Sequence, residues 1–186
     1  MNLPNKITTF RAILVPFFVF FMVFDKIPGN KWYALGVFII ASFSDLVDGK
    51  LARKYNLVTD FGKFMDPLAD KLLVCSAMIA LCGIGRLYSV VVIILIGREF
   101  IISGIRLIAA DNGRVIAASM WGKVKTVVQM IMVCFLIADL GAEFGGTVHD
   151  VIGWLEAILV VGSTMLAIIS LLEYIVKNKD VISTQK

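Results

Sequence analysis

The chain has 186 residues, of which 59% are hydrophobic and 17% are charged, and its formal net charge is +4. Its mean hydropathy is +0.90. A soluble domain of this size needs far more polar surface, so the composition excludes an ordinary soluble fold and predicts a single membrane domain over residues 1–186. The basic residues are scattered between apolar segments, so we expect membrane lipid around the chain and no nucleic acid as a partner.

Six apolar segments are long enough to cross a bilayer, which takes about 20 residues each. The first continues from Arg11 to Phe24 without a small-residue cleavage site, so we expect it to remain as a membrane helix. Turn-forming residues separate the segments. The sequence predicts an all-α, polytopic membrane protein with six transmembrane helices, at about residues 7–25, 31–55, 60–83, 88–110, 116–140 and 150–177.

Positive charges lie mainly on one side of these helices. Fifteen of the 18 Lys and Arg residues fall on that side, and three, Lys26, Lys31 and Arg86, fall on the other. Because loops rich in Lys and Arg stay in the cytoplasm, we expect a multi-pass protein of the cell membrane with both termini cytoplasmic. His149 falls on the opposite side and is expected to be a loop residue.

Four aspartates lie between residues 45 and 70, in an otherwise apolar part of the chain. On helices, Asp45 and Asp48 share one face, and Asp66 and Asp70 share another. Four carboxylates around one point are costly unless cations lie between them. Carboxylate oxygens are the usual ligands of Mg²⁺ and Mn²⁺, and two divalent cations cancel four negative charges. We therefore expect a site for two divalent cations, Mg²⁺ or alternatively Mn²⁺, in a polar cavity on the cytoplasmic side.

The residues around these aspartates suit a large phosphate ligand. Arg53 lies one turn beyond Gly49 and offers the positive charge that a diphosphate needs beside two metals. Gly49, Ala52 and Gly62 leave room for a nucleotide or phosphate near the backbone, although small residues also let helices pack closely. The apolar part of the second helix spans about 18 Å of a hydrocarbon core about 30 Å thick. The site is thus expected near headgroup level, where a lipid substrate can reach it. Asp60 follows the turn and is expected to stabilise the start of the third helix.

The residue types and spacing of this stretch resemble, without departure, the signature of the CDP-alcohol phosphotransferases. The resemblance implies a cytoplasmic site, favours a homodimer and implies that the first three aspartates bind metal. It implies that Asp70 lies beside the metals and acts as general base. Asn5 and Thr8 either reach the cytosine ring of a CDP-linked substrate or cap the first helix. The set expected to bind CDP-diacylglycerol is Asn5, Thr8, Asp48, Gly49, Ala52, Arg53, Gly62 and Asp66.

Three further segments, at residues 2–11, 97–106 and 122–126, resemble the phosphatidylglycerophosphate synthase branch of that family, while the sixth helix adds only length and hydrophobicity. The resemblance implies glycerol 3-phosphate as acceptor. Arg98 and Arg106 share a helix face and leave surplus positive charge, which suits a second anionic substrate. Alternatively, Lys123 and Lys125 are ordinary charges that flank a membrane helix on the cytoplasmic side. The expected acceptor set is Arg98, Ser103, Arg106, Lys123 and Lys125.

Other functions stay open at this point. The same chemistry could use inositol phosphate, serine or another phosphatidylglycerol as acceptor. An intramembrane prenyltransferase is also helical and acidic, but its aspartate-rich motifs have other spacing and occur in two copies. A divalent-metal transporter could use four intramembrane aspartates, but it gives no reason for Gly49, Ala52 and Arg53.

Overall fold

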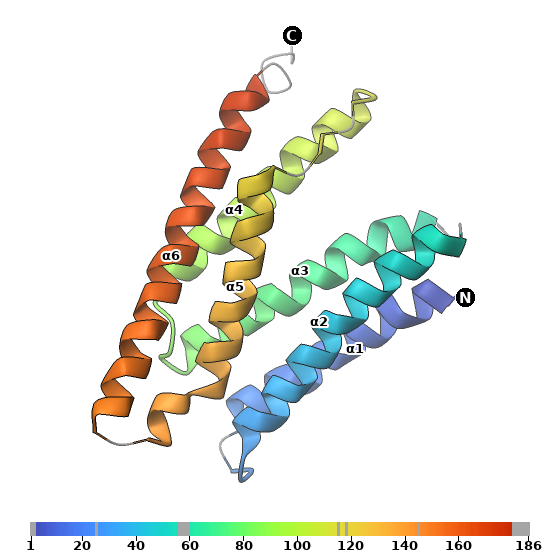
Figure 1. Cartoon of the computed structure of the whole chain (residues 1–186). Helices are drawn as coiled ribbons and strands as arrows, with labels where there is room; N and C mark the ends of the chain where they lie inside the picture. The colour runs from blue at the N-terminus through green and yellow to red at the C-terminus, as the bar shows by residue number, and fades with distance from the viewer. Residues whose placement is uncertain are drawn as a thin grey trace. The chain divides into compact units, whose positions relative to one another are not determined.

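The computed structural model describes residues 3–24, 26–55, 60–114, 116–117, 119–144 and 146–179, and among these it describes side chains outside 3–8 and 45–70. This part of the chain is helical and contains no strand (Figure 1). The all-α prediction is thus confirmed for the described residues, and each expected helix is present within a few residues of its expected ends. The helices are α1 (Leu3–Val23), α2 (Asn30–Tyr55), α3 (Asp60–Gly83), α4 (Ser89–Asp111), α5 (Met120–Ala138) and α6 (Thr147–Lys177), with a 3-10 turn η1 (Leu140–Ala142) before the last.

Two helices begin earlier than expected. α6 starts at Thr147, directly after Gly146, whose φ of 64° lets the chain turn into the helix. His149 therefore lies in the first turn of α6, with its Nδ1 2.7 Å from the carbonyl oxygen of Gly141. The expectation that His149 is a loop residue was wrong, because the helix start is set by the glycine turn and by this contact with η1.

The start of α1 bears on two of the predicted substrate residues. α1 begins at Leu3, so Asn5 and Thr8 lie within the helix rather than ahead of it. Their side chains lie outside the described part, so both alternatives, the cytosine ring and the cap, stay predictions. Asp60 is the first residue of α3, and its expected role at the start of this helix stays a prediction, because its side chain lies outside the described part.

The first compact unit consists of Met1–Leu87 and Val133–Asp139. Within it α1 packs against both α2 and α3. The ring centroids of Phe18 and Phe38 lie 5.7 Å apart between α1 and α2, and both side chains are fully buried. Ala34 and Ala41 flank Phe38 at spacings of four and three, so their small side chains let the helices approach closely.

The second compact unit consists of Tyr88–Met132 and Leu140–Lys186, and in it α4 packs against α6. The buried faces of both helices repeat at spacings of three and four, which is the pattern of helices packed along one seam. On α6 this face carries small and polar residues as well as apolar ones. The buried residues include Leu95, Arg98, Ile102, Ile105 and Ala109 on α4 and Ser163, Ala167, Ser170 and Tyr174 on α6.

Two stretches of the described chain, Met120–Ala142 and Thr147–Lys177, are long and apolar enough to cross a membrane. The helical stretches Thr9–Val23 and Lys71–Gly83 are also apolar but shorter. Large apolar side chains such as Trp154 and Ile158 are exposed on α6, as expected of a helix in contact with lipid. These helices indicate a membrane protein, whereas six crossings and a single domain stay predictions.

Candidate functional site

The predicted metal-binding stretch covers the end of α2 and the start of α3. The side chains of residues 45–70 lie outside the described part of the chain, so no contact between the four aspartates is described. The backbone on both sides of the 56–59 connection is helical. The helical periodicity on which the prediction was based is therefore present.

The two helices also bring the four aspartates to matching distances from the connection at residues 56–59. Asp45 lies about 15 Å along the axis from the end of α2, and Asp70 lies about 15 Å from the start of α3. Asp48 and Asp66 lie about 9 to 11 Å from the same helix ends. Since α2 and α3 run in opposite directions within the first unit (Figure 1), these positions fall in one band across the helix pair.

Carboxylates are the ligands that hard divalent cations prefer, so these four positions are the candidate donor set. Among the side chains that the structure describes, no group of three or more His, Cys, Asp or Glu residues could hold a metal ion. The band on α2 and α3, which lies outside those side chains, remains the candidate metal centre.

A second polar group, which we call the Glu99 cluster, consists of Arg98, Glu99 and Lys125 in the second unit. Nη1 of Arg98 donates a hydrogen bond to Oε1 of Glu99 at 3.0 Å, and the Lys125 ammonium donates to the same oxygen. The exposed fraction of the side chain is 8% for Arg98, 0% for Lys125 and 24% for Glu99. Two buried cations thus converge on one carboxylate oxygen, and charged groups buried in a membrane protein commonly serve a function.

The guanidinium of Arg98 is held by groups on α6 and α5. Its Nε donates to Oγ of Ser170 at 3.0 Å, and this hydroxyl donates to the carbonyl oxygen of Ala167 at 3.0 Å. A Cβ atom on Gly122 would lie 3.0 Å from Nη2 of Arg98, so the guanidinium packs against the α5 backbone where no side chain is present. Oγ of Ser119 accepts a hydrogen bond from the N–H of Gly122 at 3.1 Å and caps α5. The orientation of Arg98 therefore depends on two neighbouring helices.

The structure separates the residues that were predicted to bind the acceptor. Arg98 and Lys125 meet at one carboxylate oxygen, as described above. Lys123 is exposed, because two residues along a helix turn its side chain to another face. Arg106 is also exposed, about 12 Å further along α4 than Arg98.

Ser103, the fifth predicted acceptor residue, bonds to its own helix. Its hydroxyl donates to the carbonyl oxygen of Glu99, one turn earlier, at 2.6 Å. Serine hydroxyls in membrane helices commonly make this bond. This contact lies within α4, and a role of Ser103 in acceptor binding stays a prediction.

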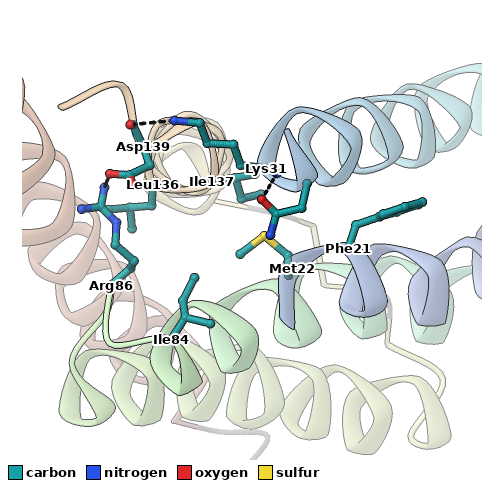
Figure 2. Close-up of a pocket in the computed structure, with 9 residues that line it drawn as sticks. Phe21, Met22, Lys31, Ile84, Arg86, Leu136, Ile137 and Asp139 are labelled. Atoms are coloured by element: carbon teal, nitrogen blue, oxygen red, sulfur yellow. Dashed lines mark hydrogen bonds and ion pairs between the residues drawn. The ribbon is translucent and has the colours of Figure 1, made fainter. Parts of the chain in front are cut away.

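A third polar group, which we call the Asp139 cluster, consists of Lys31, Arg86 and Asp139 in the first unit and borders a cavity of about 140 Å³ (Figure 2). Nη2 of Arg86 lies 2.9 Å from Oδ1 of Asp139, and Nζ of Lys31 donates to the backbone carbonyl oxygen of Asp139 at 3.3 Å. The Arg86 and Asp139 side chains are 30% and 31% exposed. These contacts join the start of α2, the turn after α3 and the end of α5, so the cluster is a structural tie. The apolar lining of the cavity includes Phe21, Met22, Ile84, Leu136 and Ile137.

Comparison with known proteins identifies the family of the chain. The sequence model of the CDP-alcohol phosphatidyltransferase family matches residues 1–179. The chain belongs to this family. A Bacillus subtilis protein named CDP-diacylglycerol–glycerol-3-phosphate 3-phosphatidyltransferase is 48% identical over 147 residues, which cover 73% of this chain and 76% of that protein. Proteins of the same name from Rickettsia felis and Escherichia coli K12 are 36% and 37% identical over 165 and 151 residues, covering 86% and 78% of this chain and 90% and 82% of those proteins.

The family predicted from the motif between Asp45 and Asp70 is therefore confirmed, and the chain is a member of a family of phosphatidyl-transferring enzymes. The sequence alone did not identify two features of this phosphatidyltransferase. Ser170, on the helix to which no role was assigned, holds Arg98, and the repeat of small residues on α6 was the available signal. Arg11 is 1% exposed in α1, and a basic residue within an apolar run was its signal.

Proposed function

We propose that this phosphatidyltransferase transfers the phosphatidyl group of CDP-diacylglycerol to glycerol 3-phosphate, forming phosphatidylglycerol phosphate and CMP. The shared name of the three relatives supports this reaction. The observation that carries the choice of acceptor is the Glu99 cluster, because two buried cations that converge on one carboxylate oxygen favour an acceptor with a phosphate. The alternatives are inositol phosphate, serine and another phosphatidylglycerol, of which inositol phosphate also carries a phosphate monoester.

In this proposal the donor lies at the band on α2 and α3. Asp45, Asp48, Asp66 and Asp70 would hold two divalent cations, Mg²⁺ or alternatively Mn²⁺, which neutralise charge on the diphosphate and on the departing CMP. The residues around them serve the donor: Arg53 adds positive charge, the small residues leave room for the nucleotide, and the first helix faces the cytosine ring. The remaining donor residues are Asn5, Thr8, Gly49, Ala52 and Gly62.

The proton transfer is assigned to Asp70. Its carboxylate takes the proton of the acceptor hydroxyl, whose oxygen then forms a bond to the β-phosphorus of CDP-diacylglycerol. The bond from that phosphorus to the bridging oxygen breaks, and the oxygen leaves with CMP. A carboxylate in contact with a cation is a weakened base, so one oxygen of Asp70 must face the hydroxyl, or the hydroxyl must already be acidified.

The proposal places this reaction at the cytoplasmic membrane surface. Both termini face the cytoplasm, all six helices cross the cell membrane as one domain, and the enzyme is a homodimer. The excess of Lys and Arg on one side of the expected helices supports the orientation. The diacylglycerol tails then remain in lipid while glycerol 3-phosphate enters from the cytoplasm.

The deciding experiment measures CMP release from CDP-diacylglycerol by the purified full-length enzyme with each candidate acceptor. We expect turnover with glycerol 3-phosphate and only background release with inositol phosphate, serine or phosphatidylglycerol. Turnover with inositol phosphate and none with glycerol 3-phosphate would contradict the proposed acceptor. A divalent-metal flux in liposomes that Asp70→Asn abolishes, with no CMP formed by the parent protein, would favour a transporter.

Three variants test which aspartates bind metal and which one takes the proton. For Asp45→Asn and Asp66→Asn we expect the metal concentration at half-maximal activity to rise by at least about tenfold. For Asp70→Asn we expect turnover to be lost while metal still binds. An Asp70→Asn enzyme with near-normal turnover would rule out Asp70 as the base.

A further inference from the structure

Glu99 is the anion between two buried cations that the proposed function assigns to the acceptor phosphate. We propose that Glu99 is an internal counter-ion which occupies the phosphate position when the acceptor is absent and is displaced when the phosphate binds. This inference rests on the proposed function for the statement that the acceptor carries a phosphate. It adds a residue and a mode of binding to that function.

The contacts of Glu99 resemble those of a bound phosphate oxygen. A single atom, Oε1, receives hydrogen bonds from both Arg98 and Lys125. Of the three side chains in the cluster, the carboxylate is the most exposed at 24%, whereas Lys125 is completely buried. An anion can therefore reach the two cations by replacing Glu99, whose carboxylate can turn toward the exposed side.

Arg98 does not need Glu99 to keep its orientation. Its Nε is bound to Ser170, and its Nη2 packs against the α5 backbone at Gly122. When Glu99 leaves, Nη1 and Nη2 remain side by side as a fork that matches two oxygens of a phosphate. The role of Glu99 is thus to compensate charge rather than to position the guanidinium.

The charges match this exchange. A phosphate monoester carries about −1.5 to −2 at neutral pH, which two cations neutralise. With Glu99 still in place the carboxylate and the phosphate would repel each other. Without either anion, two buried cations would lose the carboxylate that they share, which destabilises the folded chain. Glu99 therefore stabilises the empty enzyme and competes with the acceptor.

The test uses Glu99→Gln in the purified full-length enzyme, with Glu143→Gln as the matched control. Glu143 is an exposed carboxylate in the turn before α6. We expect Glu99→Gln to lower the KM for glycerol 3-phosphate by about fivefold or more and to change kcat by less than about twofold. Without ligand its thermal midpoint should fall by about 5 °C or more, and saturating glycerol 3-phosphate should restore most of the loss. Glu143→Gln should change neither the KM nor the thermal midpoint.

A rise in KM for Glu99→Gln would overturn the proposal, since Glu99 would then help to bind the acceptor. An unchanged KM and midpoint would overturn it as well. If Glu99→Gln does not fold, Glu99→Asp supplies the test, because the shorter carboxylate holds the cations less closely and should also lower the KM. A rise in KM for Glu99→Asp would again exclude displacement.

Binding of inorganic phosphate separates this inference from the proposed function. We expect inorganic phosphate to raise the thermal midpoint of Glu99→Gln more than that of the parent enzyme, and glycerol to raise neither. If the enzyme fails to use glycerol 3-phosphate but shows this difference, the proposed acceptor is wrong and the counter-ion role stands. If the acceptor assay succeeds and the difference is absent, the counter-ion role is wrong.

Discussion

The Asp139 cluster and the Glu99 cluster contain the same charges, two cations and one carboxylate, in very different surroundings. In the Asp139 cluster the paired arginine and aspartate are each about one-third exposed, at 30% and 31%. In the Glu99 cluster the two cations are 8% and 0% exposed and share one carboxylate oxygen. Identical charge counts therefore do not imply identical roles.

The difference lies in how each carboxylate is used. Asp139 pairs with Arg86 through its side chain and with Lys31 through its backbone carbonyl, so each contact is separate. A partly exposed ion pair of this kind contributes about 0–1 kcal/mol to stability. In the Glu99 cluster both cations are buried, and removing one partner of a buried pair costs about 3–5 kcal/mol. The partly exposed charges join segments of the chain, whereas the proposed function assigns the buried cations to a ligand.

The largest difference should appear when the arginine of each cluster is removed. Arg98→Ala should lower kcat/KM for glycerol 3-phosphate by about 100-fold or more, because two charge-assisted hydrogen bonds to the phosphate are lost at about 1.5–3 kcal/mol each. Arg86→Ala should leave kcat/KM within about twofold. CMP release by the two purified variants measures both. An equal loss in the two variants would contradict the assignment of the Asp139 cluster as a structural tie.

The next largest difference is expected between variants of two lysines of α5. Lys125→Met preserves side-chain length but removes the buried ammonium, and it should raise the KM for glycerol 3-phosphate by about tenfold or more. Lys123→Met, two residues away on an exposed position, should change the KM by less than about threefold. Steady-state kinetics at fixed CDP-diacylglycerol compares them. A larger effect at Lys123 would place the acceptor on the outer face of α5.

A smaller effect is expected from a methyl group added beside Arg98. The Cβ of Gly122→Ala would lie 3.0 Å from Nη2 of Arg98 and 3.3 Å from Oγ of Ser119, so the guanidinium must shift. The KM for glycerol 3-phosphate should rise by about three- to tenfold, although alanine favours a helix over glycine by about 1 kcal/mol. Gly153→Ala is the control, because nothing lies within 4 Å of its added Cβ. Reduced stability without a change in KM would mean that Gly122 matters only for packing.

The smallest effect should follow from neutralising the Asp139 cluster. Asp139→Asn removes the ion pair with Arg86, and asparagine tolerates the φ of 45° at this position. The free energy of unfolding should fall by no more than about 1 kcal/mol, and the kinetic constants should not change. Thermal unfolding in detergent, together with the CMP assay, measures both. A loss of activity would show that this end of the molecule also serves the reaction.

Most of the helices could be predicted because hydrophobic length is a local property of the chain. The helix ends were predicted less well. α6 begins three residues before the expected start at residue 150, because Gly146 adopts a positive φ and His149 contacts Gly141. The spacing of the aspartates also identified the family, since Asp45 and Asp70 belong to a motif that needs no knowledge of distant packing. The structure describes that motif only as two helices, so the metal site itself stays a prediction.

The sequence by itself determined six helices, the family and the four aspartates, because helical periodicity and motif spacing are read within a few turns of the chain. The tertiary structure decided which of the predicted acceptor cations are buried together. Lys125 faces Glu99 while Lys123 is exposed, and Ser170, 72 residues after Arg98, holds its guanidinium. The physical reason is that burial and charge pairing depend on which helix faces pack against each other, and side chains from distant parts of the chain meet only after packing.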